Sequence, residues 1–460
     1  MDETKSVLRL IRMSWKLFIA RTARRVVAPA LSLAAIGAIV AMPPAASAQL
    51  LGALPGQVLP GTPLVDPLRG LTGQLADTVE NLDRLTAREA GDLLERVRLD
   101  RIDALLHDNR EVIERDRHGD PALRGILVAS GIDDTALAAA RAAGFTVVSR
   151  EDIAGLDLSV TRFAVPSGIS LADAERRLAA LLPAADIAAD TLYFPSGGDA
   201  RIASVPLALA AGAASAAAAT PRIGMIDGGV GAHDSIPPIE QRGFARNAPR
   251  ASGHGTAVAS LLVGRGKIAG AAPRARLLAA DVYGDDPAGG NATAIVRALG
   301  WMVQRDVPVV TISLVGPANA LLGKAIAAAQ AKGTMVVAAV GNDGPAAPPA
   351  YPASYDGVVA VTGVDRRNRA LVEAGRARHI DFAAPGADLK GARIGGGLTR
   401  LRGTSYAAPF VAARLLAHHP AQGNGSAAIA ALAREANDLG KPGRDPVYGY
   451  GLVCGTCATR

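Results

Sequence analysis

Cysteine is scarce in this chain. Its 460 residues contain two, Cys454 and Cys457, both in the tail 454–460. A zinc site with four ligands would need a second pair, and no strand followed by a helix supports a thioredoxin-like redox motif. The pair is either a small disulfide, which an oxidising compartment favours, or two free thiols with no chemical role.

Aromatic side chains are also few, at 3%, while 49% of the residues are hydrophobic and 20% are charged. This balance excludes a wholly disordered chain and a polytopic membrane protein. At about 100 to 200 residues per domain, the length predicts two or three domains, each large enough to bury a core.

A continuous basic surface is missing, although the formal net charge is +7 and the isoelectric point is near 9.6. Residues 49–220 hold 16 basic and 24 acidic side chains, which gives −8, whereas residues 221–460 hold 26 and 16, which gives +10. No basic run with interleaved aromatic residues occurs in 221–460. We therefore expect scattered surface arginines and no nucleic-acid partner.

The N-terminus has the composition of a secretory signal. Three arginines precede the apolar stretch 26–40, and the small residues Ala46 and Ala48 stand just before Gln49. A charged region, a hydrophobic region and a small-x-small site in this order predict a signal peptide over residues 1–48. The apolar stretch is shorter than the ~20 residues that span a membrane. The chain is thus expected to be exported to the periplasm, the cell envelope or the medium, and to meet the membrane only through this segment.

Two segments follow that carry no recognisable chemistry. Residues 49–73 are rich in Gly, Pro and Leu and are predicted to be a linker. Within 74–120, apolar residues recur at steps of three and four among charged ones, which predicts one or two amphipathic helices up to about Arg117.

Residues 124–195 have a different rhythm, in the order strand, helix, strand, strand, helix, strand. The expected strands are 125–130, 145–149, 159–166 and 187–194, and the expected helices are 133–143 and 171–182. This order is the split βαβ pattern of a ferredoxin-like domain, a fold that fixes no function. Residues 196–220 are rich in Ala, Gly and Ser and are predicted to be a linker or processing region.

Three short segments of the last 240 residues carry side chains suited to nucleophilic catalysis. Asp227 ends an apolar strand, His254 lies in Ser-Gly-His-Gly-Thr before a helical run, and Ser405 lies in Gly-Thr-Ser-Tyr-Ala-Ala-Pro before another helix. Taken singly, each has an ordinary reading, such as a packing histidine or an N-cap serine. Together they form an ordered set of acid, base and nucleophile.

In the order Asp, His, Ser, these segments resemble the subtilases, the subtilisin-like serine peptidases. The serine segment matches Gly-Thr-Ser-x-Ala-x-Pro and the histidine segment matches Gly-His-Gly-Thr. The aspartate segment departs from the family pattern, because Gly228 stands where Ser or Thr is usual. This glycine leaves the carboxylate intact but is expected to loosen its hydrogen-bonded support. The α/β-hydrolases run Ser, acid, His from a Gly-x-Ser-x-Gly elbow, which this sequence lacks.

Further segments extend the resemblance. Gly341-Asn342-Asp343-Gly344 is similar to the family's Gly-Asn-x-Gly, which implies that Asn342 donates to the oxyanion. Residues 312–316 resemble the family's Ser-Leu-Gly-Gly strand with one glycine replaced by valine, and residues 283–290 fall where an opposing substrate loop is expected. The implied substrate-binding residues are Ser313, Leu314, Val315, Gly316 and Gly341.

The resemblance covers about residues 221–453 and implies an α/β fold, a subtilisin-like parallel sheet flanked by helices. A small α+β ferredoxin-like domain and a helical segment would precede it. The implied activity is hydrolysis of polypeptides by a serine endopeptidase with the triad Asp227, His254 and Ser405. Residues 124–195 look like the pro-domain that many subtilases carry as an intramolecular inhibitor, removed by self-processing.

The chemistry needs no cofactor, and no metal ligand is predicted. A structural calcium is left open, because subtilases often bind one and Asp281, Asp285 and Asp286 offer oxygen ligands. These residues form no acidic loop of defined spacing, however, so a solvated substrate loop is the favoured interpretation. Two other functions also stay open: an inactive subtilase-like binding module, which Gly228 permits, and a membrane-anchored envelope factor whose segment 74–120 acts as a spacer.

Overall fold

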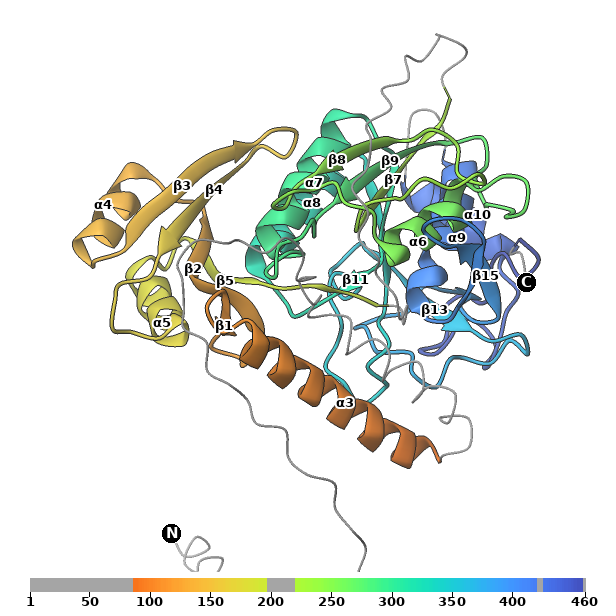
Figure 1. Cartoon of the computed structure of the whole chain (residues 1–460), viewed down its shortest axis with the longest axis horizontal. Coiled ribbons are helices and arrows are strands. Elements are labelled where there is room, and N and C mark those ends of the chain that lie inside the picture. Colours follow the sequence, from red (N-terminus) through yellow and green to blue (C-terminus); the bar gives the residue numbers. More distant parts are fainter. Residues whose placement is uncertain (1–85, 197–219, 420–424, 458–460) are drawn as a thin grey trace, which may run out of the picture. The chain divides into compact units, whose positions relative to one another are not determined.

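The computed structural model describes residues 86–196, 220–419 and 425–457 (Figure 1). The predicted signal segment 1–48, the predicted linker 49–73 and all but the ends of 196–220 lie outside these residues. Among the described residues, no helix combines the length and the apolar character that crossing a membrane requires.

The described chain begins with one long helix, α3 (Ala87–Asp108). A capping box starts it: the Thr86 hydroxyl accepts the backbone N–H of Glu89, and the Glu89 carboxylate accepts that of Thr86. The sequence predicted helix up to about Arg117, but α3 ends earlier, because the chain turns at Asn109 and forms the short strand β1 (Ile113–Arg115).

A small antiparallel sheet with two helices follows, in the predicted order of elements. The strand order is β5-β2-β4-β3, with β1 beside the first part of β2, which is the order of a ferredoxin-like domain. Both helices pack their apolar faces on this sheet. The elements are β2 (Pro121–Ser130), α4 (Asp134–Ala142), β3 (Thr146–Ile153), β4 (Leu158–Ala164), α5 (Leu171–Leu181) and β5 (Asp186–Thr191).

The last predicted strand of this domain, 187–194, is in fact two. Strand β5 ends at Thr191, and the chain then leaves the sheet and forms β6 (Phe194–Pro195). Strand β6 pairs antiparallel with β11 (Leu314–Val315), more than 100 residues later in the chain. The pattern of residues 187–194 does not reveal such a change of partner, because both halves keep an extended backbone.

The second half of the chain contains a seven-stranded sheet, in which every neighbouring pair is parallel. The strand order is β14-β13-β12-β10-β7-β9-β8. The strands are β7 (Arg222–Asp227), β8 (Glu240–Gly243), β9 (Arg276–Asp281), β10 (Val309–Ile312), β12 (Met335–Ala339), β13 (Val359–Val364) and β14 (Phe382–Pro385).

Helices cover both faces of this sheet, as its buried strands require. Along β9, Leu278 and Ala280 face a core shared with α7 (Ala292–Gln304) and α8 (Ala320–Ala331). Leu277 and Ala279 face the opposite core, which is shared with the helices α6 (Gly253–Val263), α9 (Ala408–His418) and α10 (Gly425–Glu435). The predicted α/β fold with a flanked parallel sheet is confirmed.

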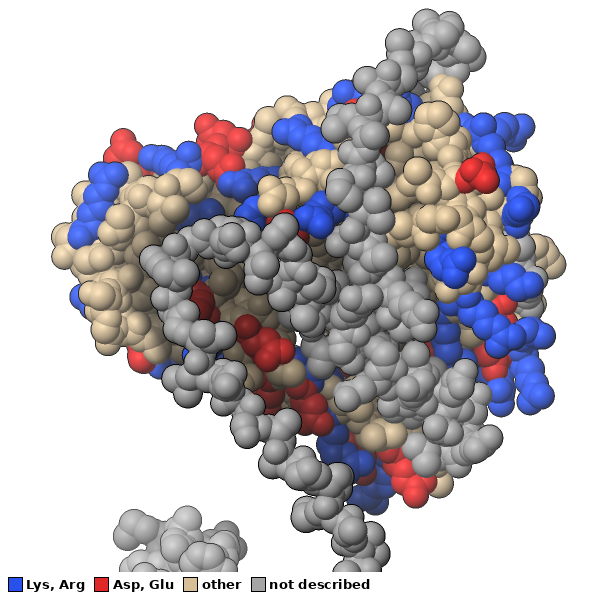
Figure 2. Space-filling model, viewed as in Figure 1, with Lys and Arg blue, Asp and Glu red and all other residues tan. Residues whose placement is uncertain are grey.

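Two peripheral features complete the described chain. The hairpin of β15 (Leu389–Ala392) and β16 (Leu398–Leu401) carries exposed Lys390, Arg393 and Arg400, and Figure 2 shows Lys and Arg side chains gathered on the same side of the molecule. In the tail, Cys454 and Cys457 form a disulfide, which resolves the two alternatives left by the sequence.

Candidate active site

The carboxyl edge of the parallel sheet gathers the predicted polar residues. Asp227 is the last residue of β7, Ser313 directly follows β10, and Asn342 follows β12. Open parallel sheets bind their ligands at this edge. Two helices complete the site: His254 lies in the first turn of α6, and Ser405 lies in the short 3₁₀ turn Thr404–Tyr406 before α9.

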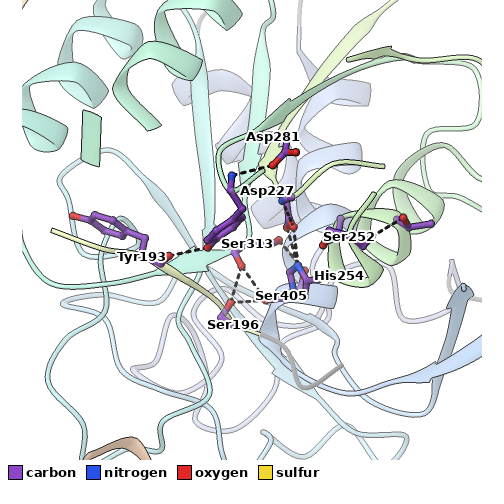
Figure 3. A network of polar contacts seen from close by, with 12 residues as sticks. Tyr193, Ser196, Asp227, Ser252, His254, Asp281, Ser313 and Ser405 are labelled. Carbon is purple, nitrogen blue, oxygen red and sulfur yellow. Dashed lines mark hydrogen bonds and ion pairs between the residues drawn. The ribbon is translucent and has the colours of Figure 1, made fainter. Parts of the chain in front are cut away.

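Asp227 and His254 form a buried pair. Nδ1 of His254 lies 2.9 Å from each of the two carboxylate oxygens of Asp227 (Figure 3). The two residues are 0% and 3% exposed. Because Nδ1 faces an acceptor, it carries the proton of the neutral ring, and Nε2 keeps its lone pair. Nε2 is buried and has no hydrogen-bond partner among the residues that the structure describes, so it can accept a proton.

Gly228, the departure from the subtilase pattern, has a structural explanation. A methyl group on its Cα would lie 2.5 Å from Cβ and 2.6 Å from Oγ of Ser252, so the Ser252 side chain fills the space that a larger residue would need. Ser252 caps helix α6 by accepting the backbone N–H of Gly255, beside His254. The sequence suggested that Gly228 loosens the support of Asp227; in the structure, the backbone N–H of Gly228 itself donates to Oδ1 of Asp227 at 2.7 Å.

The hydroxyl group of Ser405 is fully buried and lies between two partners. Oγ donates to the carbonyl oxygen of Ser313 at 3.1 Å and lies 2.5 Å from Oγ of Ser196 (Figure 3). It makes no hydrogen bond to His254 in this arrangement. The histidine ring also lies beside Tyr406, with the ring centres 5.4 Å apart. The candidate nucleophile Ser405 and the candidate base His254 are therefore in one site, with the hydroxyl group of Ser405 turned towards the strand that precedes Ser313.

Asn342 is tied to the serine segment. Its Oδ1 accepts the backbone N–H of Thr404 at 3.0 Å, and the Thr404 hydroxyl donates to the carbonyl oxygen of Gly341 at 3.1 Å. This arrangement uses the acceptor of the Asn342 amide and leaves the Nδ2 donors for a substrate oxygen. The two loops that would face a developing oxyanion are thus held together next to Ser405.

The predicted substrate strand is occupied by a segment of the chain itself. Strand β6 pairs with β11 in the register Leu314 to Pro195 and Val315 to Phe194. The backbone N–H of Ser196 donates to the carbonyl oxygen of Ser313 at 3.1 Å. Extended peptides bind sheet edges in this way, through main-chain hydrogen bonds.

The loop after β9 holds the other side of the same segment. The backbone N–H of Tyr193 donates to the carbonyl oxygen of Gly290 at 2.9 Å, and the Tyr283 hydroxyl donates to the carbonyl oxygen of Tyr193 at 2.8 Å. Burial raises the pKa of the Tyr283 phenol well above its usual value, so it remains a donor. The loop 283–290 therefore opposes β11 across the bound segment, where the sequence placed it.

Helix α3 reaches the loop that carries Asn342. Leu94, 2% exposed, packs against Gly344, and a methyl group on this glycine would lie 2.9 Å from Cδ1 of Leu94. Arg101 pairs with Asp343 at 2.9 Å, next to Asn342. The sequence alone indicates no role at the site for this helix, because its apolar spacing is that of any packing helix.

The acidic residues considered as metal ligands have partners within the chain. Asp281 accepts the N–H groups of Arg250, Tyr283 and Gly284, and burial raises the pKa of its carboxyl group. Asp285 pairs with Arg246 and Arg250. Within the described ranges, no three side chains of His, Cys, Asp or Glu are grouped as a metal site.

Two functional positions escaped the sequence reasoning. Ser196 and Tyr193 carry no motif, and only their place before an Ala/Gly-rich stretch hinted at processing. Ser252 was visible in the histidine segment, but its packing against Gly228 joins two separate motifs.

Comparison with known proteins agrees with this site. The description of the subtilase family matches residues 211–451. Subtilisin BL from Lederbergia lenta is 31% identical over 252 residues, which are 52% of this chain and 90% of that protein. The minor extracellular protease Epr from Bacillus subtilis is 29% identical over 242 residues, which are 50% of this chain and 37% of that protein.

Solved structures extend the likeness in fold. Fervidolysin from Fervidobacterium pennivorans, a keratinolytic enzyme related to subtilisin, has a TM-score of 0.57 at 18% identity, covering 73% of this chain and 61% of that one. The epidermin leader peptide processing serine protease from Staphylococcus aureus has a TM-score of 0.54 at 18% identity, covering 71% and 96%. Because the family match spans just over half of the 460 residues and contains Asp227, His254 and Ser405, the chain belongs to the subtilase family of serine peptidases.

Proposed function

We propose that this protein is an exported serine endopeptidase that hydrolyses peptide bonds through an acyl-enzyme on Ser405 and first cuts its own chain after Ser196. The observation that carries this proposal is the position of Ser196 beside Ser405. Its N–H is bonded to Ser313 and its hydroxyl group lies 2.5 Å from that of Ser405. These contacts support the proposal that Ser405 attacks the carbonyl group of Ser196 and cuts the bond that follows it.

The first half of the reaction forms the acyl-enzyme. The Ser405 hydroxyl turns from the Ser313 carbonyl to Nε2 of His254, which takes its proton as Oγ attacks the carbonyl carbon of residue 196. The carbon–nitrogen bond then breaks, and the imidazolium gives the proton to the leaving amine. Asp227 holds the ring and stabilises its charged form.

Two donors stabilise the oxyanion of the tetrahedral intermediate: Nδ2 of Asn342 and the backbone N–H of Ser405. Water then attacks the acyl group while His254 removes its proton; the ester bond to Ser405 breaks, and His254 returns the proton to Oγ. The bonds from Oδ1 of Asn342 to Thr404, and from Thr404 to Gly341, keep the donors in place, so little reorganisation accompanies the appearance of charge.

Residues 124–195 act in this proposal as the intramolecular inhibitor. Their final strands lead into the site, and Ser405 and His254 are buried while β6 is bound. Export follows from the predicted signal peptide, with a cut after Ala48 that leaves Gln49 as the first residue.

A fluorophosphonate probe tests the activity, because it reacts with an activated serine. The self-processed protein is expected to be labelled at Ser405, and the Ser405→Ala protein is expected to stay unlabelled. An unlabelled wild-type protein that has lost residues 49–196 would support the inactive binding module instead. Sequencing of the N-terminus of the exported protein distinguishes the membrane-anchored factor, which would keep residues 1–48.

A further inference from the structure

Strand β6 and its neighbouring residues are bound in the candidate active site, so their side chains indicate which substrate residues the site accepts. If the cut follows Ser196, as the proposed function has it, Ser196 is the residue before the cut and Tyr193 is the fourth before it. On the enzyme side, the residues from Ser313 to Pro317 run antiparallel to this segment.

Val315 lies on the face of this ladder that carries the side chain of residue 196. In antiparallel strands, opposite residues share a face and successive residues alternate, so Val315, opposite Phe194, shares its face with Ser196, two residues further on. Such diagonal neighbours are within reach of long side chains. A side chain larger than that of serine at position 196 would therefore extend towards Val315.

The space beyond Val315 is closed. A methyl group on Gly341 would lie 3.3 Å from Cγ1 and 3.7 Å from Cγ2 of Val315, and Ala350 borders the same point. Val315 is 8% exposed. Its branched side chain thus fills the gap between β11 and the loop of Gly341, at the position where the resembling family motif has glycine.

We propose that Val315 is a specificity-determining residue that restricts the substrate residue before the cut to a side chain about the size of serine or alanine. This inference rests on the proposed function. Overlap with this side chain is not easily relieved by rotation, since branching at Cβ restricts the rotamers of valine. Differences of a few carbon atoms in a closed pocket change kcat/KM by about 10- to 200-fold.

The test uses the full-length precursor and times the cut after position 196 by mass spectrometry. Ser196→Ala is expected to be cut at a rate close to that of the wild type, whereas Ser196→Phe is expected to be cut about 10- to 200-fold more slowly. Adding Val315→Gly to the Ser196→Phe precursor is expected to restore most of the rate. Val315→Ala, a smaller change to the strand, should restore part of it.

Each contrary result has one meaning. Rapid cleavage of the Ser196→Phe precursor, or no rescue by either Val315 variant, would overturn the role of Val315 while leaving the peptidase intact. A folded wild-type precursor that stays whole would overturn the proposed function itself, together with the inference that rests on it.

A second inference is carried by different contacts, those of Tyr193. Its side chain is fully buried, and its hydroxyl group donates to the carbonyl oxygen of Pro317 at 2.8 Å. Continuing the register of β6 and β11 places Tyr193 opposite Gly316, and a methyl group there would lie 2.6 Å from Cδ1 of the tyrosine ring. The adjacent Tyr355 hydroxyl is engaged by both backbone groups of Asn319.

We infer that this pocket recognises a tyrosine four residues before the cut, and that it does so through the phenol hydroxyl group. A site built around a buried hydrogen bond rejects a ligand that lacks the hydroxyl, because its own polar atom then stays unpaired. Phenylalanine would fill the same space but would leave the Pro317 carbonyl without its donor.

Cleavage of three precursors separates recognition of the hydroxyl from recognition of the ring. Tyr193→Phe is expected to slow the cut by about tenfold, and Tyr193→Ala is expected to slow it further. The self-processed enzyme should show the same order towards peptides with Tyr, Phe or Ala in this place before Phe-Pro-Ser-Gly. Equal rates for Tyr and Phe in both assays would overturn the inference. A Gly316→Ala enzyme should lose the preference for tyrosine, and a preserved preference would contradict the pocket.

Discussion

The hydroxyl groups of Ser196 and Ser405, 209 positions apart in the chain, lie 2.5 Å from each other. Ser196 ends the described N-terminal part of the chain, and Ser405 is the proposed nucleophile. Strands β6 and β11 hold the segment of Ser196 by main-chain pairing, as a sheet edge binds an extended peptide, which supports the proposal that the precursor cuts its own chain. The expected consequences concern catalysis, release of the bound segment and the position of the cut.

Replacement of the nucleophile or the base should abolish peptide hydrolysis. Ser405→Ala and His254→Ala are each expected to lower kcat by a factor on the order of 10⁶, because the triad acts as a unit. The double variant should be scarcely worse than either single one. Circular dichroism and thermal unfolding serve as controls of the fold, and near-wild-type hydrolysis by either folded single variant would remove the triad assignment.

Loss of the oxyanion donor should slow catalysis without removing it. Asn342→Ala is expected to lower kcat by about 10² to 10³, with a smaller change in KM, because the donor acts on charge that develops in the transition state. The substitution also removes the acceptor of the Thr404 N–H, so a lower Tm is expected as well. An unchanged kcat would assign Asn342 to loop structure alone.

Release of the cleaved segment should depend on pH through Asp190. This carboxyl group is fully buried, accepts the backbone N–H and the hydroxyl group of Thr293, and lies 3.6 Å from Arg162. Burial raises its pKa above the ordinary value, although Arg162, Thr293 and the more distant Arg297 oppose the shift. Because the bound form has the higher pKa, it holds the proton more tightly than the released form. Binding is therefore strongest at low pH and weakens as the pH rises through the pKa of the bound form.

The onset of peptide hydrolysis after self-cleavage measures this release. The onset is expected to become faster with rising pH in the wild type and to depend less on pH in Asp190→Asn, which stays neutral. Asp190→Ala should release the segment faster at every pH, because the N–H of Thr293 loses its acceptor. A pH profile that Asp190→Asn leaves unchanged would assign the dependence to another group.

Salt should also speed the release. Ion pairs join acidic side chains of the N-terminal part to basic ones of the catalytic part: Glu151 to Arg297 at 2.5 Å, Asp186 to Lys324, and Asp157 to Lys332. Exposed pairs contribute about 0.2 to 1 kcal/mol each and are screened by salt. The rate of release is thus expected to rise severalfold at high ionic strength, and Glu151→Gln should reduce this rise. A release rate that does not change with salt would mean that apolar contacts, and not ion pairs, determine how fast the segment leaves.

The sequence was most informative where function demands particular residues in short segments. Asp227, His254 and Ser405 were each ambiguous alone, and their order and flanking glycines indicated one chemistry, which the family match supports. The rhythm of residues 124–195 likewise predicted the order of strands and helices in the small sheet, because hydrophobic period is a local property. The α/β fold of the second half was implied by the resemblance to the subtilases.

The remaining features depend on contacts between distant segments, which no local pattern records. Strand β6 was predicted as the end of β5, because nothing in Phe194 or Pro195 shows that their partner is β11. Gly228 was interpreted as a weakness, since the sequence does not show that Ser252 fills its place. The contact of Leu94 with Gly344 was invisible for the same reason.

The position of the cut tests the account most directly. The wild-type precursor and the Ser405→Ala precursor are produced in a host that lacks other extracytoplasmic proteases, and their intact masses are measured after export. The account predicts that the wild type separates into a fragment ending at Ser196 and one beginning at Gly197, whereas the Ser405→Ala chain stays whole from Gln49 onwards. A Ser405→Ala chain cut at the same bond, or a wild-type chain cut only elsewhere, would contradict it.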